Sequence, residues 1–120
     1  IARLKDGGMV ITGIDRPVEG KTRELTFFGH NCHLPAGHIR MALAAGVPVI
    51  PAAVTMEPGG QYGLAVGAPI AMRTGGNEAG CIRENAEAVL AVLATFIRRA
   101  PQQWLMYYPV WPHALAACPS

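Results

Sequence analysis

Six charged residues cluster within ten positions of the sequence and form its first candidate site. They are Asp15, Arg16, Glu19, Lys21, Arg23 and Glu24. The guanidinium and ammonium groups could hold a phosphate or another anion. A carboxylate among them could orient a histidine or accept a proton. The alternative interpretation is a solvated loop whose charges pair with one another.

A second group of reactive side chains lies between positions 30 and 38. It contains three histidines and one cysteine, His30, Cys32, His33 and His38. Imidazole and thiolate are the usual ligands of zinc, but this spacing matches no standard zinc site. Histidines at the surface and at the start of a helix are therefore the favoured interpretation, and a zinc site at His30, Cys32 and His33 is the rival.

Nucleophilic catalysis finds little support in the sequence. A catalytic cysteine needs a nearby base and a lowered pKa, which the sequence alone does not reveal. The three cysteines, Cys32, Cys81 and Cys118, are too scattered and too few for a disulfide framework. The only serine is Ser120, so a serine-hydrolase triad within this sequence is excluded. No glycine motif for nucleotide phosphates occurs either.

The composition excludes several classes of protein. The 120 residues allow one domain or part of one. With 51% hydrophobic and 15% charged residues, the chain is not of the disordered type. A net charge of +2 without a basic run argues against a nucleic-acid partner. No run of about 20 apolar residues is present to span a bilayer, which still permits contact with a membrane surface.

Hydrophobic periodicity predicts a small α/β fold, with a mixed sheet of about four to five strands and two helices packed on it. A continuous apolar run that follows a helix, as at Val47–Val54, is typical of a buried parallel strand. A period of 3.6 residues indicates the longer helix. The expected strands are Met9–Ile14, Glu24–Phe28, Val47–Val54, Gln61–Val66 and an edge strand within Trp104–Trp111; the expected helices are Leu34–Ala45 and a long one from Asn77 to about Arg99.

The aromatic tail is a further candidate surface. It carries Trp104, Tyr107, Tyr108 and Trp111. Tyrosine and tryptophan side chains can anchor a protein at a membrane interface. An edge strand that covers the core is the commoner role of such a segment.

Taken in order, several short motifs resemble a known family. They are Phe27-Phe28-Gly29, Leu34-Pro35-Ala36-Gly37, Gly46–Pro51 and Pro101-Gln102-Gln103-Trp104-Leu105. These motifs resemble the bacterial lipid A biosynthesis acyltransferases and the similar phosphatidylinositol mannoside acyltransferases, within the lysophospholipid acyltransferase group. The resemblance covers roughly Leu4 to Pro112.

The resemblance implies a membrane-associated acyltransferase that works without metal or cofactor. Such enzymes move a fatty acyl chain from an acyl-carrier-protein or acyl-CoA thioester to a glycolipid or phospholipid hydroxyl, at the cytoplasmic face of the inner membrane. A histidine in an HxxxxD/E motif is their general base. None of the four histidines here has a carboxylate at that spacing. Residues 1–120 are therefore expected to be a single partial domain, the C-terminal half, inactive without an upstream half.

The resemblance also suggests roles for the charged cluster. Glu24 is the candidate partner of the upstream catalytic histidine. The candidate substrate-binding residues are Asp15, Arg16, Glu19, Lys21 and Arg23. Asp15 and Glu19 both remain candidates for the carboxylate that ends a strand in this family. The rival hypothesis is a non-catalytic module that binds a lipid headgroup or a partner through the basic loop and the aromatic tail.

Overall fold

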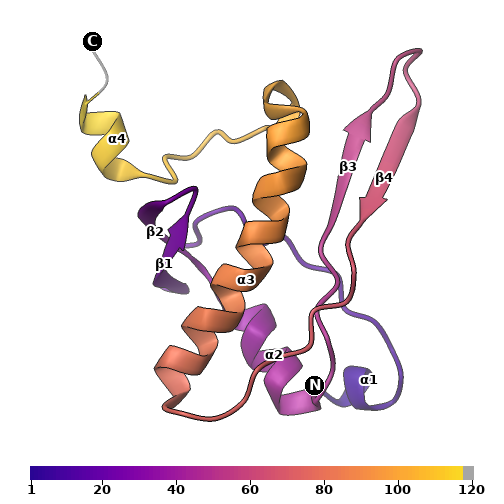
Figure 1. The fold of residues 1–120 in the computed structure, drawn as a ribbon, viewed down its shortest axis with the longest axis vertical. Coiled ribbons are helices and arrows are strands. Elements are labelled where there is room, and N and C mark those ends of the chain that lie inside the picture. The colour runs from indigo at the N-terminus through magenta and orange to yellow at the C-terminus, as the bar shows by residue number, and fades with distance from the viewer. Residues whose placement is uncertain (118–120) are drawn as a thin grey trace.

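The computed structural model describes residues 1–117, so Cys118 and Ser120 lie outside the described residues. Short helices and strands alternate along the chain around one long helix (Figure 1). The elements are α1 (Ala2–Lys5), β1 (Thr22–Phe27), β2 (His30–Pro35), α2 (Gly37–Ala45), β3 (Ala52–Met56), β4 (Tyr62–Val66), α3 (Glu78–Arg99), the 3-10 helix η1 (Pro101–Gln103) and α4 (Pro112–Ala117). Within this part of the chain, no helix combines the length and the hydropathy needed to cross a bilayer.

The four strands form two antiparallel hairpins. β1 pairs with β2 from Thr22↔Pro35 to Phe27↔His30, and β3 pairs with β4 from Ala52↔Val66 to Met56↔Tyr62. The hairpins are separate two-stranded sheets. The prediction of a small α/β fold with about four strands is therefore confirmed, while the strands pair only within their own hairpins instead of forming one mixed sheet.

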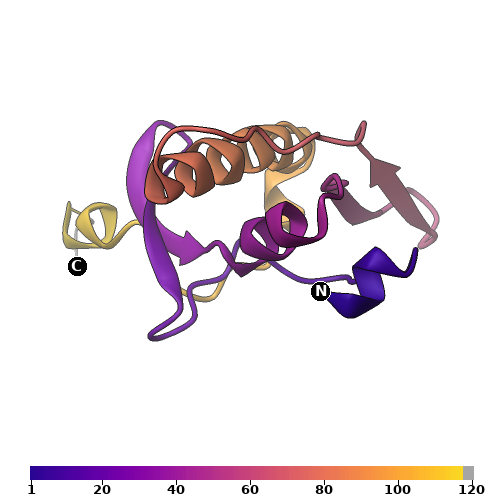
Figure 2. The same ribbon diagram turned by 90° about the horizontal axis from the view of Figure 1, so that it is seen from below.

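The long helix α3 is the central support of the fold. It begins after Asn77, whose side-chain Oδ1 accepts a hydrogen bond from the Gly80 backbone N–H at 2.6 Å, as an N-cap does. Its buried positions follow the helical period and face the rest of the molecule. α3 crosses the molecule between the two hairpins, with α2 beside it (Figures 1 and 2). The predicted helix from Asn77 to Arg99 is confirmed.

The hydrophobic core lies between α3 and the first hairpin. Its buried members are Leu25, Phe27, Cys32, Leu34, Ala36, Ile39, Ile82, Ala86, Val89, Leu90, Ala94 and Val110. The second hairpin contributes no residue to this cluster. The core thus fixes the positions of β1 and β2. It thereby also positions the side chains on the exposed face of these strands.

The predicted strand at Met9–Ile14 is wrong. This segment has no strand assignment, and its Met9 and Ile11 side chains are 74% and 88% exposed. β-branched residues favour a strand only where a partner can accept and donate the backbone hydrogen bonds. No described segment pairs with these residues.

The predicted buried parallel strand at Val47–Val54 is also wrong. Regular pairing begins only at Ala52, is antiparallel, and leaves Val54 64% exposed. Pro48 and Pro51 lack the N–H group that a ladder needs, so upstream of β3 only an isolated bridge forms. The predicted return strand at Gln61–Val66 is confirmed as β4, because the Glu57–Gly60 turn folds the chain back.

The helix predicted at Leu34–Ala45 begins later, at Gly37, because β2 takes up Leu34 and Pro35. The missed strand exists because Phe28 (φ 52°) and Gly29 (φ 75°) form a two-residue turn in the left-handed region. The helix ends as expected at Gly46, whose φ of 68° is typical of a C-cap. The predicted edge strand in the aromatic tail is wrong, since no strand forms there.

Candidate functional site

The charged cluster divides between a surface hollow and the first strand. Asp15, Arg16 and Glu19 line an open hollow of ≈ 530 Å³, together with Gly13, Pro17, Val18 and Tyr108. Lys21 lies exposed just before β1, and Arg23 and Glu24 lie on β1 itself. The structure therefore brings three of the six predicted site residues together and places the other three at the start of β1 and on it.

Two side-chain contacts attach this hollow to the aromatic tail. The Trp104 indole Nε1 donates a hydrogen bond to Asp15 Oδ2 at 2.8 Å. The Arg16 Nη2 donates to the Tyr108 Oη at 2.8 Å, and its guanidinium carbon lies 4.5 Å from the Tyr108 ring centroid. These contacts hold an adjacent carboxylate and guanidinium in defined orientations, although neither belongs to a regular element.

The oriented pair keeps most of its binding capacity. A guanidinium carries five N–H donors and a carboxylate has about four lone-pair sites. The described contacts use only one donor of Arg16 and one lone pair of Asp15. Arg16 can therefore still take an anion through two parallel hydrogen bonds, while Asp15 can accept from a ligand hydroxyl.

Glu24 lies on the exposed face of β1, opposite the buried Leu25 and Phe27 side chains. Its cross-strand partner is His33 of β2, which is also exposed. Side chains at such paired positions are neighbours in an antiparallel sheet. The structure thus places the Glu24 carboxylate beside the His33 imidazole on a solvent-accessible face. The sequence pattern did not predict that these two residues are neighbours.

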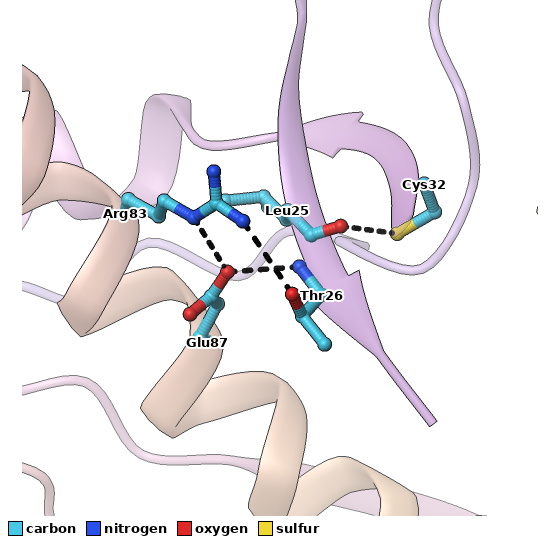
Figure 3. A network of polar contacts seen from close by, with 5 residues as sticks. All are labelled: Leu25, Thr26, Cys32, Arg83 and Glu87. Carbon is cyan, nitrogen blue, oxygen red and sulfur yellow. Dashed lines mark hydrogen bonds and ion pairs between the residues drawn. The ribbon is translucent and has the colours of Figure 1, made fainter. Parts of the chain in front are cut away.

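A polar network joins α3 to β1 next to Glu24 (Figure 3). Glu87 Oε1 accepts a hydrogen bond from the Thr26 backbone N–H and another from Arg83 Nε, both at 2.9 Å. Arg83 Nη2 also donates to Thr26 Oγ1 at 3.5 Å. The network fixes β1 two residues from Glu24. Sequence reasoning missed it, although the Arg83–Glu87 spacing of four residues is a visible helix signal.

Cys32 lies beside this network and does not have the properties of a catalytic nucleophile. Burial, aided by the negative charge of Glu87, raises the pKa of the Cys32 thiol to about 11. The thiol donates a hydrogen bond to the Leu25 carbonyl at 3.4 Å (Figure 3). A protonated and buried thiol of this kind is inert at neutral pH.

The zinc hypothesis does not fit the geometry of β2. Consecutive strand residues point to opposite faces, and Cys32 is buried while its neighbour His33 is exposed. Among residues 1–117, no three His, Cys, Asp or Glu side chains gather as metal ligands. His38 lies apart on α2, buried, and burial lowers its pKa to about 4.

The aromatic tail covers the core through its side chains. Trp104 and Trp111 pack against Phe27 and Phe28, with ring centroids 5.8–6.2 Å apart. The Trp111 Nε1 also donates a hydrogen bond to the Phe27 carbonyl at 3.0 Å. The predicted covering role is therefore correct, although the tail performs it without forming a strand.

Comparison with models of protein families identifies the family. A family model described as "Bacterial lipid A biosynthesis acyltransferase" matches residues 1–112. The matched range includes the hollow, both hairpins, α3 and the aromatic tail. No curated protein gives a significant match.

Proposed function

Because the chain belongs to the bacterial lipid A biosynthesis acyltransferase family, we propose that it binds and orients the lipid acceptor during acyl transfer. The observation that carries this proposal is the pair of contacts that fix Asp15 and Arg16 at the edge of the hollow. Asp15 accepts a hydrogen bond from the acceptor, and Arg16 binds its anionic group. Glu19, Lys21 and Arg23 add charge around this subsite.

The reaction is the transfer of a fatty acyl chain from an acyl-carrier-protein or acyl-CoA thioester to a hydroxyl of a glycolipid or phospholipid. A histidine base removes the hydroxyl proton while the oxygen attacks the thioester carbonyl. The tetrahedral intermediate then collapses, the C–S bond breaks, and the departing sulfur receives the proton. The thiol and the acylated lipid leave at the cytoplasmic face of the inner membrane.

Glu24 serves as the partner of that histidine in the proposal. A carboxylate that accepts a hydrogen bond from an imidazole holds the ring in one tautomer and stabilises its protonated form. The Glu87 contact to Thr26 supports this role by fixing the strand that carries Glu24. Since no histidine of residues 1–120 is followed by a carboxylate at the HxxxxD/E spacing, the base itself is proposed to come from outside them.

The test is Glu24→Gln in the full-length acyltransferase that contains this chain. We expect kcat to fall about 100-fold or more, in the range of acid–base contributions, while the circular dichroism spectrum stays unchanged. Glu84→Gln is the matched control, because Glu84 is an exposed glutamate on α3. Unchanged turnover in Glu24→Gln would remove Glu24 from the site.

The missing HxxxxD/E spacing favours a second candidate, a non-catalytic module that binds a lipid headgroup or a partner. Such a module folds alone, stays monodisperse and binds anionic vesicles without any acyl transfer. The non-catalytic module would be excluded if the protein that contains this chain shows turnover and Glu24→Gln abolishes it.

A further inference from the structure

The Trp104 side chain contacts two separate parts of the candidate site. Its indole Nε1 donates a hydrogen bond to Asp15 Oδ2 at 2.8 Å. Its ring also packs against Phe27 and Phe28, with ring centroids 6.0 and 6.2 Å away. Phe27 is the last residue of β1, the strand that carries Glu24. One side chain therefore connects the carboxylate at the hollow with the strand of the proposed histidine partner.

The loop that carries Asp15 has few other attachments. Within the described part of the chain, residues 9–17 make no backbone hydrogen bond. Their side chains contact the rest of the molecule through Ile14, which packs against the core, through Asp15, and through Arg16, which donates to Tyr108. A segment with so few contacts opens locally at little cost in free energy. The orientation of the Asp15 carboxylate therefore depends on the side chain that binds it.

Trp104, in contrast, is held independently of this loop. It directly follows η1, and its backbone N–H donates to the Pro101 carbonyl at 3.2 Å. Its ring contacts three other aromatic rings, the third of them Trp111 at 6.0 Å. Tyr108 is less well fixed, since it is 46% exposed and lies outside any helix or strand. The Trp104 indole is therefore the donor whose position is set before the loop binds to it.

We propose that Trp104 is a positioning residue, which orients the Asp15 carboxylate for the lipid acceptor and attaches its loop to the strand that carries Glu24. The inference rests on the proposed function and adds to it the residue that connects the two parts of the site. Trp104 occupies Oδ2 of Asp15, and Oδ1 has no hydrogen bond to the described residues. Oδ1 is thus left to accept a hydrogen bond from the acceptor. A carboxylate that is already oriented binds its ligand without first losing rotamer freedom.

The contact itself can be tested without any substrate. The sequence contains two tryptophans, so a ¹H–¹⁵N NMR spectrum of the 120-residue chain has two indole N–H signals. Asp15→Ala should shift the Trp104 signal and leave the Trp111 signal in place, because Trp111 donates to the Phe27 carbonyl instead. A Trp104 signal that does not move, or equal shifts of both signals, would overturn the proposal.

The functional test is Trp104→Phe in the full-length acyltransferase that contains this chain. The acceptors are a lipid A precursor and a phosphatidylinositol mannoside, each assayed with palmitoyl-CoA and with palmitoyl-acyl-carrier protein. Phenylalanine keeps the aromatic packing on β1 and removes only the N–H donor. We expect the KM for the acceptor to rise about tenfold and kcat to stay within about twofold, as for the loss of a binding contact.

Trp111→Phe is the matched control. It removes an indole N–H from the same aromatic cluster, but that N–H binds the Phe27 carbonyl and not the loop. Its KM for the acceptor should stay within about twofold of the unmodified enzyme. The double variant Asp15→Ala/Trp104→Phe should be no worse than Asp15→Ala, because both changes remove the same interaction. A fall in kcat without a change in KM, or equal effects of the two tryptophan variants, would assign Trp104 a structural role and overturn the proposal.

Asp15→Ala distinguishes a failure of this inference from a failure of the proposed function. If Asp15→Ala raises the KM for the acceptor and Trp104→Phe does not, the acceptor subsite stands and the role of Trp104 is rejected. If Asp15→Ala leaves the KM unchanged, the proposed acceptor subsite is wrong, and the positioning role is rejected with it. Absence of turnover with every pair of acceptor and donor would reject both.

Discussion

Both hairpins are antiparallel, but the first buries its large apolar side chains and the second exposes them to solvent. In β1–β2, Leu25, Phe27 and Leu34 are at most 2% exposed, whereas Val54 and Leu64 of β3–β4 are 64% and 66% exposed. In both hairpins the larger apolar side chains lie on one face of the paired strands. The difference lies in what packs against them: α3 and the aromatic tail cover the first hairpin, and no described element covers the exposed apolar face of the second.

The two hairpins nevertheless share one feature, a side-chain hydrogen bond to the backbone of the leading strand. A side chain of the α3–η1 segment binds the backbone of each leading strand, Glu87 at Thr26 and Gln103 at Met56. A free strand edge exposes unpaired N–H and C=O groups, and both contacts satisfy part of that edge. Polar contacts therefore fix the position of both hairpins, while only the first hairpin also buries large apolar side chains.

The largest difference is expected for aromatic truncation. Phe27→Ala should lower the free energy of unfolding by about 3–5 kcal/mol, because it leaves a cavity beneath Trp104 and Trp111. Tyr62→Ala should change it by less than about 0.5 kcal/mol, since Tyr62 is 74% exposed. Urea unfolding of both variants measures the two values. Similar losses in the two variants would mean that the second hairpin also contributes to the cooperative core.

The next largest effect is a pH dependence of the free energy of unfolding, caused by the buried His38 side chain. His38 follows β2, and burial lowers its pKa from 6.5 to about 4. Between these two pH values His38 is protonated in the unfolded chain and neutral in the folded chain. The free energy of unfolding therefore keeps its whole His38 contribution above pH 6.5. It falls as the pH drops from about 6.5 to about 4, by at most about 3 kcal/mol.

Unfolding in urea at a series of pH values tests this expectation. His38→Leu should flatten the profile between about pH 6.5 and 4. His33→Gln should leave it in place, because His33 is exposed on β2. A profile that is unchanged in His38→Leu would assign the pH dependence to other groups.

The smallest effects are expected at the two strand edges. Glu87→Ala removes a charged acceptor from the Thr26 N–H and should cost about 1–2 kcal/mol. Gln103→Ala frees only the more exposed edge at Met56 and should cost about 0.5–1 kcal/mol. Hydrogen exchange of the Thr26 and Met56 amides separates the two, since each variant should expose its own amide. A larger loss in Gln103→Ala would reverse the proposed ranking of the hairpins.

The parts of the fold that local patterns specify were predictable. α3 follows from its 3.6-residue period and from Asn77, and β4 follows from the Glu57–Gly60 turn. β2 was missed because its formation depends on Phe28 in a left-handed conformation, which phenylalanine rarely adopts. Met9–Ile14 was wrong for the converse reason, since its strand-like composition finds no partner.

The candidate site was predictable to a similar degree. Charge density along the sequence found Asp15, Arg16 and Glu19, which do share one hollow. It could not find Trp104 and Tyr108, because their hydrogen bonds join residues 89 and 92 positions apart. Contacts of that range are products of the fold and leave no local pattern.

The aromatic cluster also has a consequence for how the protein is made. The Trp111 indole binds the Phe27 carbonyl 84 residues earlier in the chain. During translation at about 5–20 residues per second, the first hairpin therefore emerges on the order of 10 s before the rings that cover it. For that interval the nascent chain exposes Phe27 and Phe28, and a chaperone at the ribosome would meet these two rings before Trp111 covers them.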